Sequence, residues 1–122
     1  MPARPDRLGE QIRAELSLLL QRWARDPVLR LTTVTHVRLT RDLQHARVYF
    51  TVLGDATARR HAGRGLRRAA SFLRGQLGRR LRFRHVPDLT FVYDDSLERE
   101  ERIAQVLEEL DLPPSEPDEL PA

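Results

Sequence analysis

The sequence predicts a single α+β domain in which helices pack on one face of a three-stranded mixed β-sheet. Apolar residues recur at helical spacing in three long segments and alternate as in strands in three short ones, in the order helix, strand, strand, helix, strand, helix. The first two strands are joined by a short link and should be antiparallel, whereas the long helical crossover should return the third strand parallel. At 122 residues and 40% hydrophobic content, the chain is long enough for one compact core.

The first helix is expected at residues 6–24. Its apolar residues recur every three or four positions and form a core-facing stripe made of Leu8, Ile12, Leu16, Leu19, Leu20 and Trp23. Asp6 is the expected N-cap. Asp26-Pro27 should end the helix, because proline disfavours helical geometry in the residue before it.

Residues 31–40 and 45–53 are expected to form a hairpin, since the link through Arg41, Asp42 and Leu43 is short. The first strand is rich in β-branched residues, and strict alternation places on one face Leu31, Thr33, Thr35, Val37 and Leu39. The second alternates more cleanly and places on one face Ala46, Val48, Phe50 and Val52.

Residues 56–81 return to helical spacing, with a buried stripe made of Leu66, Ala69, Ala70, Leu73, Leu77 and Leu81. The opposite side of this helix carries Arg60, Arg64, Arg67, Arg68 and Arg74. A straight helix of this length would extend about 39 Å, which is longer than so small a domain can cover. A break is therefore predicted at the small residues Ala69, Ala70 and Ser71, with Gly75 as the second candidate. The full order becomes α-β-β-α-kink-α-β-α.

The third strand is expected at residues 89–93, followed by a helix that Asp94, Asp95 and Ser96 would cap. The apolar positions of this last helix are Leu97, Ile103, Val106, Leu107 and Leu110. The domain is therefore assigned to residues 6–110. Residues 1–5 are expected to be flexible, and the acidic, proline-rich residues 111–122 to be a disordered tail.

Charge is strongly segregated along the chain. The 32 residues between Asp55 and Asp88 contain ten arginines and no carboxylate, whereas residues 94–122 contain eleven carboxylates and two arginines. Such a basic block repels itself unless a polyanion neutralises it, and nucleic acid is the commonest cellular polyanion. All 21 basic side chains are arginine, whose planar fork suits phosphate contacts and stacking on unpaired bases. A solvated basic face without a ligand is the alternative.

Several segments, taken together and in order, resemble the ribosome-binding factor A family. The resemblance covers roughly residues 4–110 and is carried by residues 7–12, Asp26-Pro27, residues 34–37, residues 42–50, residues 72–74, residues 77–82 and residues 86–97. It implies a KH-like domain of type II topology, in which an Ala-x-Gly helix kink replaces the usual Gly-x-x-Gly loop. In this sequence Ala69-Ala70-Ser71 stands at that kink, with serine in place of the glycine. Gly75-Gln76-Leu77-Gly78 matches Gly-x-x-Gly literally, but Leu77 belongs to the apolar stripe, which argues against a phosphate-binding loop there.

The resemblance also implies a function. Members of the family bind the free 30S ribosomal subunit and assist late maturation of 16S rRNA, including processing of its 5′ end, without catalytic activity. We accordingly expect a cytoplasmic, monomeric protein with no cofactor, no small-molecule substrate and no membrane association. The start of the chain has no apolar signal core, and no apolar run approaches the length of a membrane span.

The predicted RNA contacts lie mainly on the central helix and just after it. The primary set is Arg60, Arg64, Arg67, Arg68, Arg74, Arg79, Arg80, Arg82 and Arg84; the secondary set, on or beside the hairpin, is Arg38, Arg41 and Arg47. With few aromatic residues expected at the surface, recognition should rest on RNA shape and backbone.

Other classes of function have weaker support. The four histidines lack metal-ligand spacing, there is no cysteine, and no nucleophile elbow or phosphate loop is present, so neither a catalytic nor a metal site is expected. Asp94-Asp95 as a magnesium site in a nuclease is less economical than a helix cap. A protein-interaction module remains open, in which the acidic tail engages a basic partner or the domain's own arginines; a general RNA-binding KH module also remains open.

Overall fold

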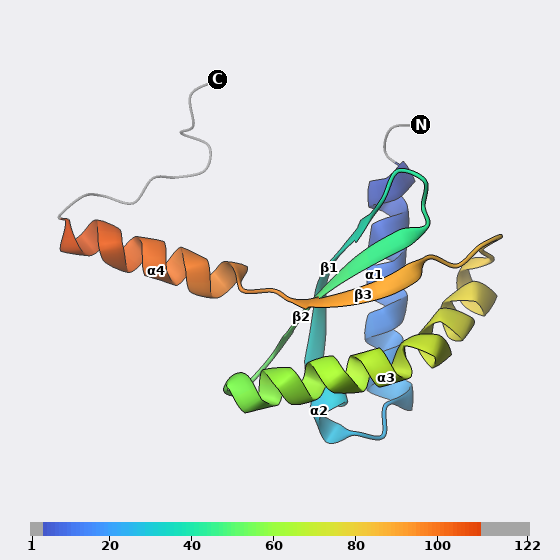
Figure 1. Ribbon diagram of the computed structural model, residues 1–122, viewed down its shortest axis with the longest axis horizontal. Helices are drawn as coiled ribbons and strands as arrows, with labels where there is room; N and C mark the ends of the chain where they lie inside the picture. Colours follow the sequence, from blue (N-terminus) through green and yellow to red (C-terminus); the bar gives the residue numbers. More distant parts are fainter. Residues whose placement is uncertain (1–3, 111–122) are drawn as a thin grey trace.

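The computed structural model describes residues 4–110 of the chain, so the predicted tail and the first three residues lie outside it. Its elements in chain order are α1 (Arg4–Trp23), α2 (Pro27–Arg30), β1 (Thr32–Leu39), β2 (His45–Val52), α3 (Ala56–Leu81), β3 (Asp88–Tyr93) and α4 (Ser96–Glu109) (Figure 1). None of these helices is both long and apolar enough to cross a membrane.

The three strands form one mixed sheet in the order β1-β2-β3. β1 pairs antiparallel with β2, and β2 pairs parallel with β3, as the connection lengths predicted. The inward side chains of the strands form a single core with α1 and α3, which includes Ile12, Leu16, Val48, Leu66 and Leu77. Because both helices contribute to this one core, the other face of the sheet is left open.

The first strand departs from strict alternation. A bulge between Val34 and His36 leaves Thr35 as an extra residue, so that Val34 and Val37 both face the core. The predicted face was therefore wrong in its first half, because Leu31, Thr33 and Thr35 are exposed. The second strand alternates as predicted, with Ala46, Val48, Phe50 and Val52 buried.

Helix α1 begins at Arg4, two residues before the predicted start, so Asp6 lies within the helix and not at the N-cap position. The predicted stripe is buried at Ile12, Leu16, Leu19 and Leu20, but Trp23 is 55% exposed. Gly9 lets the helix approach β1 closely, because a Cβ at this position would lie 2.6 Å from the carbonyl oxygen of Val37.

The short helix α2 was not predicted. Asp26 caps it by accepting a hydrogen bond from the Val28 N–H at 3.0 Å, and Pro27 occupies its first turn. Its Leu29 packs on α3 at Gly65, where a Cβ would come within 3.0–3.3 Å of the Leu29 side chain. The prediction that Asp26-Pro27 ends the first helix is therefore consistent with the end of α1 at Trp23, but the same two residues also begin α2.

Helix α3 has the predicted bounds, and Asp55 caps it by accepting from the N–H groups of Thr57 and Ala58. It is one continuous helix and is not interrupted by the predicted break. Figure 1 shows instead that it bends between its green and yellow parts, within residues 60–80, the stretch that contains Ala69, Ala70 and Ser71. The literal Gly-x-x-Gly sequence lies inside the helix, with Leu77 fully buried. Bending shortens the span of the helix while keeping its backbone hydrogen bonds.

Helix α4 projects away from the rest of the fold and buries none of its residues (Figure 1). Its apolar side chains Leu97 and Ile103, and that of Leu110 just after the helix, are all more than 60% exposed. The predicted packing of helices on the sheet therefore holds for α1 and α3 but not for α4.

Candidate nucleic-acid interface

Four arginines form the centre of the candidate interface. Arg60, Arg64, Arg67 and Arg68 are all exposed and lie on the side of α3 opposite to buried Ala62, Leu66 and Leu73. They span nine residues, or about 12 Å of helix axis. The structure thus brings together the central part of the predicted set; these four residues are called the α3 arginine face below.

The α3 arginine face makes no ion pair with the carboxylates of residues 4–110, although Arg68 lies near enough to Asp26 to help lower the pKa of that carboxyl. None of the ion pairs within residues 4–110 involves these four side chains; Arg60 donates only a long hydrogen bond, at 3.4 Å, to the Thr57 hydroxyl. Like charges spaced three or four residues apart on a helix repel one another. A polyanion lying along this face would relieve that repulsion and gain charge-assisted hydrogen bonds.

Two other arginines of the predicted set are engaged inside the protein. Arg74 donates from Nε to the Pro87 carbonyl at 3.1 Å and from an Nη to the Val86 carbonyl at 2.9 Å, and it pairs with Asp88 at 3.3 Å. Arg80 lies 3.5 Å from Glu15 of α1. Arg74 therefore holds the segment before β3 against α3. Its contacts within the protein give it a structural role.

Arg79, Arg82 and Arg84 are exposed at the end of α3 and just beyond it. Arg82 adopts a left-handed conformation, with φ of 53°, and ends the helix. The basic surface thus continues past the bend, where the chain turns toward β3.

The secondary set lies elsewhere. Arg38 and Arg47 face each other across β1 and β2 on the open side of the sheet, and Arg41 lies in the hairpin turn. Because α3 packs on the other side of the sheet, these side chains do not continue the α3 arginine face.

Sequence reasoning missed two features of this surface. Arg59, on α3 but outside the predicted set, lies over the Tyr93 ring with its Cζ 4.3 Å from the centroid, and it pairs with Glu98 of α4 at 3.0 Å. Trp23 and Phe72 are 55% and 47% exposed and line a hollow of about 190 Å³ between α1 and α3. Helical spacing assigned Trp23 to the core. Trp23 is the last residue of α1, and the spacing gave no signal that its side chain would be exposed there.

The ionisable groups outside the arginine set have structural partners. His61 contacts the Asp26 carboxylate at 2.7 Å, and this hydrogen bond, with that from the Val28 N–H, lowers the pKa of Asp26. Asp94 accepts from the Thr35 hydroxyl at 2.6 Å and from the Ser96 N–H at 3.0 Å. The N-cap residue of α4 is Asp95, which makes no side-chain capping hydrogen bond, so of the expected cap only the contact from Asp94 is formed. Within residues 4–110, no three His, Asp or Glu side chains gather as a potential metal site.

Comparisons with known proteins agree on one family. The family model for ribosome-binding factor A matches residues 4–107. Ribosome-binding factor A of Thioalkalivibrio sulfidiphilus is 43% identical over 106 residues, which are 87% of this chain and 82% of that protein.

Solved structures give the same result. A Thermotoga maritima protein assigned as a ribosome binding factor A superposes with a TM-score of 0.69 at 32% identity, covering 80% of this chain and 94% of the other. A Thermus thermophilus ribosome binding factor A, fitted as a homology model into a cryo-EM map of a 30S complex, has a TM-score of 0.64 at 33% identity and covers 75% and 96%. These likenesses confirm the KH-like α+β fold.

Proposed function

This chain belongs to the ribosome-binding factor A family, and on that premise we propose that it binds the free 30S subunit and assists late maturation of 16S rRNA, including processing of its 5′ end. Support comes from the names of its relatives and from the 30S complex of the Thermus thermophilus protein. A factor with this role works in the cytoplasm, where subunits are assembled.

The observation that carries the proposal is the α3 arginine face. Four guanidinium groups on about two turns of helix, without carboxylate partners in the described part of the chain, match the backbone of a structured RNA. Arg79, Arg82 and Arg84 extend the contact beyond the bend. Arg74 supports it indirectly by fixing the segment that carries Arg84.

The mechanism requires no bond-making by the protein. Phosphate contacts along a bent, rigid helix would hold one conformation of the rRNA and so favour maturation from that conformation. Affinity should therefore fall steeply with salt, by roughly 0.7–0.9 log units of binding constant per log unit of salt for each phosphate contact.

The test is sedimentation of the tagged protein with ribosomal particles through a low-salt gradient. The wild type should migrate with free 30S subunits, and the double variant Arg64→Glu/Arg67→Glu should remain at the top. The matched control is Arg99→Glu/Arg102→Glu, which reverses two exposed arginines three residues apart on α4. This control should still migrate with 30S subunits.

The melting temperature of the Arg64→Glu/Arg67→Glu variant should stay near that of the wild type, since both side chains are exposed. Co-migration of this variant with the 30S subunit would remove the α3 arginine face from the proposal. Equal binding of the wild type to unrelated RNAs would indicate a general RNA-binding module instead. In cells, the same variant should leave 16S rRNA with unprocessed 5′ ends, as measured by primer extension.

A further inference from the structure

We propose that the open face of the sheet is a second RNA site, which binds a single-stranded segment through a guanidinium pair and an adjacent aromatic pair. Arg38 and Arg47 would contact a phosphate, and Tyr49 with His36 would stack on the neighbouring base. The inference rests on the RNA-binding function proposed above, but it concerns a surface on the opposite side of the sheet from α3.

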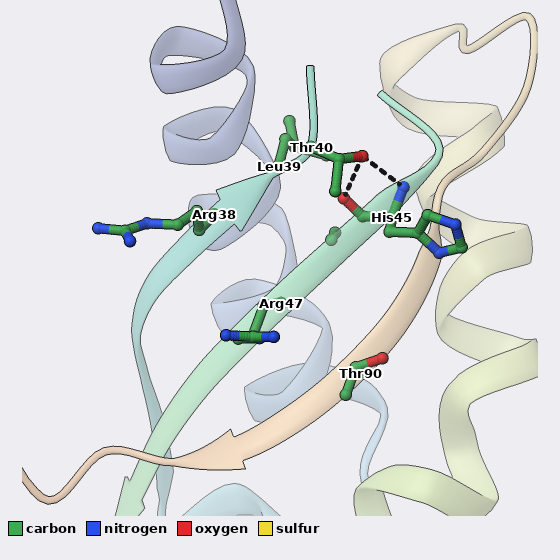
Figure 2. A pocket seen from close by; sticks show the side chains of 7 residues that line it. Arg38, Leu39, Thr40, His45, Arg47 and Thr90 are labelled. Carbon is green, nitrogen blue, oxygen red and sulfur yellow. Dashed lines mark hydrogen bonds between the residues drawn. The ribbon is translucent and has the colours of Figure 1, made fainter. Parts of the chain in front are cut away.

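The guanidinium pair lies at one end of the hairpin. Arg38 and Arg47 are direct cross-strand partners, and Thr90 is the partner of Arg47 on β3. These three residues, with Thr40 and His45 and the apolar Leu39 and Ala46, line a hollow of about 460 Å³ (Figure 2). Beside these two apolar residues, the hollow therefore offers cationic and hydrogen-bonding side chains from all three strands.

The charges of this pair are not balanced by the protein. Like charges directly opposite each other on a sheet are destabilising, and no ion pair within residues 4–110 includes Arg38 or Arg47. The carboxylates near this part of the sheet are engaged elsewhere: Asp42 accepts from the Thr40 hydroxyl, and Asp88 pairs with Arg74. An anion between the two guanidinium groups would replace repulsion with charge-assisted hydrogen bonds.

The aromatic pair points to a nucleotide as the source of that anion. His36 and Tyr49 are also cross-strand partners, with ring centroids 5.9 Å apart and an interplanar angle of 37°. They lie two residues along the same strands from Arg38 and Arg47, on the same face, or about 7 Å away at the usual rise of a strand. A single nucleotide spans this distance. A phosphate held by the arginines would therefore place its base over the aromatic pair, the arrangement by which sheets bind unpaired RNA bases.

The location makes the site independent of the α3 arginine face. The core that α1 and α3 share with the sheet is built from the alternate side chains, such as Val37, Val48 and Phe50. α4 leaves the end of β3 and does not cover the open face (Figure 1). The domain would thus hold two RNA segments at once, a structured one on α3 and an unpaired one on the sheet.

The test uses fluorescence anisotropy with a labelled single-stranded RNA octamer and, as comparison, a blunt RNA duplex. The variant Arg38→Gln/Arg47→Gln should bind the octamer at least tenfold more weakly and lower the slope of log affinity against log salt by about 0.7, for one single-strand phosphate contact. Its affinity for the duplex should not change. Arg64→Glu/Arg67→Glu should show the opposite pattern, with weaker duplex binding and retained octamer binding.

Stacking is tested separately at Tyr49. Tyr49→Ala should weaken octamer binding at least fivefold, whereas Tyr49→Phe should retain it, because the ring and not the hydroxyl makes the contact. A melting temperature within a few degrees of the wild type shows that the sheet is intact. If the melting temperature of Tyr49→Ala is lower than that, the proposal is decided by the octamer affinities of Tyr49→Phe and Arg38→Gln/Arg47→Gln.

The two proposals fail differently. Wild-type octamer affinity in Arg38→Gln/Arg47→Gln, or no octamer binding by the wild type, overturns the sheet site and leaves 30S co-migration untouched. Loss of 30S co-migration by the wild type would overturn the proposed function while the octamer result still stands by itself.

Discussion

Helices α3 and α4 have similar amphipathic patterns, but the apolar residues of α3 are buried and those of α4 are not. On α3 the apolar residues Leu66, Leu73 and Leu77 are at most 2% exposed, and arginines face outward. On α4 the apolar residues Leu97 and Ile103 are 62% and 61% exposed, and the other side chains are largely carboxylates. The difference does not lie in the helical pattern, because both helices show a stripe of the same period.

What distinguishes the two helices is how the chain holds their ends. α3 connects two adjacent strands of one sheet, so the parallel crossover presses its apolar stripe onto the core. α4 follows the last strand and is held only near its start, where Glu98 accepts hydrogen bonds from Arg59 and from the Tyr93 hydroxyl. An apolar stripe therefore becomes core only where the topology supplies a surface for it.

The largest expected effect compares the two stripes directly. Leu66→Ala on α3 should lower the free energy of unfolding by about 2–5 kcal/mol, because it leaves a cavity in the core. Ile103→Ala on α4 should change it by less than about 0.5 kcal/mol, since the side chain is already exposed. Urea titration measures both. A cost at Ile103 similar to that at Leu66 would mean that α4 packs on the domain in solution.

The next effect separates two kinds of arginine within α3. Arg74→Ala should cost roughly 1–2 kcal/mol of folding stability, because two carbonyls and Asp88 lose their partner. Arg68→Ala should leave the free energy of unfolding unchanged and weaken RNA binding. Thermal melts and RNA titrations of both variants provide the measurement; equal stability would show that Arg74 is also a free surface residue.

A smaller effect concerns the contact that joins the two helices. Glu98→Gln weakens the interactions with Arg59 and Tyr93 and should cost roughly 0.5 kcal/mol, because the paired Arg59 and Glu98 side chains are more than a third exposed and solvent screens them. Amide hydrogens at the start of α4 should exchange faster in this variant. Glu101→Gln, an exposed position on the same helix, is the control and should leave exchange unchanged.

The smallest effect is a pH dependence at the base of α4. The hydrogen bond from the Thr35 hydroxyl, followed by that from the Ser96 N–H, lowers the pKa of Asp94 below its ordinary value of 3.8. The charged form is thus favoured in the folded state, so its stabilisation is complete above pH of about 4–5 and is lost as pH falls through the lowered pKa. Thr35→Val should reduce this acid sensitivity in urea titrations between pH 2 and 6, and Thr33→Val, on an exposed position of the same strand, should not.

Local patterns in the sequence were sufficient for much of the architecture. The apolar period located α3 at residues 56–81, and alternation located β2 and its buried face. The charge pattern also located the arginines of the α3 face, because residues three and four apart on a helix share a side whatever surrounds them. These features depend on neighbours in sequence, so the sequence alone could determine them.

Other features depend on contacts between distant residues. The bulge at Thr35, the turn of α2 against Gly65 and the exposure of α4 each reflect which surface lies opposite, and no periodicity encodes that. The same holds for the roles of the arginines. Arg74 and Arg68 are both basic residues of one helix, but only the fold brings the Val86 and Pro87 carbonyls to the first and leaves the second in solvent.

The sequence by itself thus determined the order of the strands and long helices and the segregation of charge, because hydrophobic period and composition act locally. The resemblance of its motifs pointed to the family. Only the tertiary structure decided which arginines make no ion pair within residues 4–110, and that Arg38 and Arg47 share the open face of the sheet with His36 and Tyr49. The physical reason is that hydrogen bonds and ion pairs at about 3 Å join residues that are far apart along the chain, and folding alone brings them together.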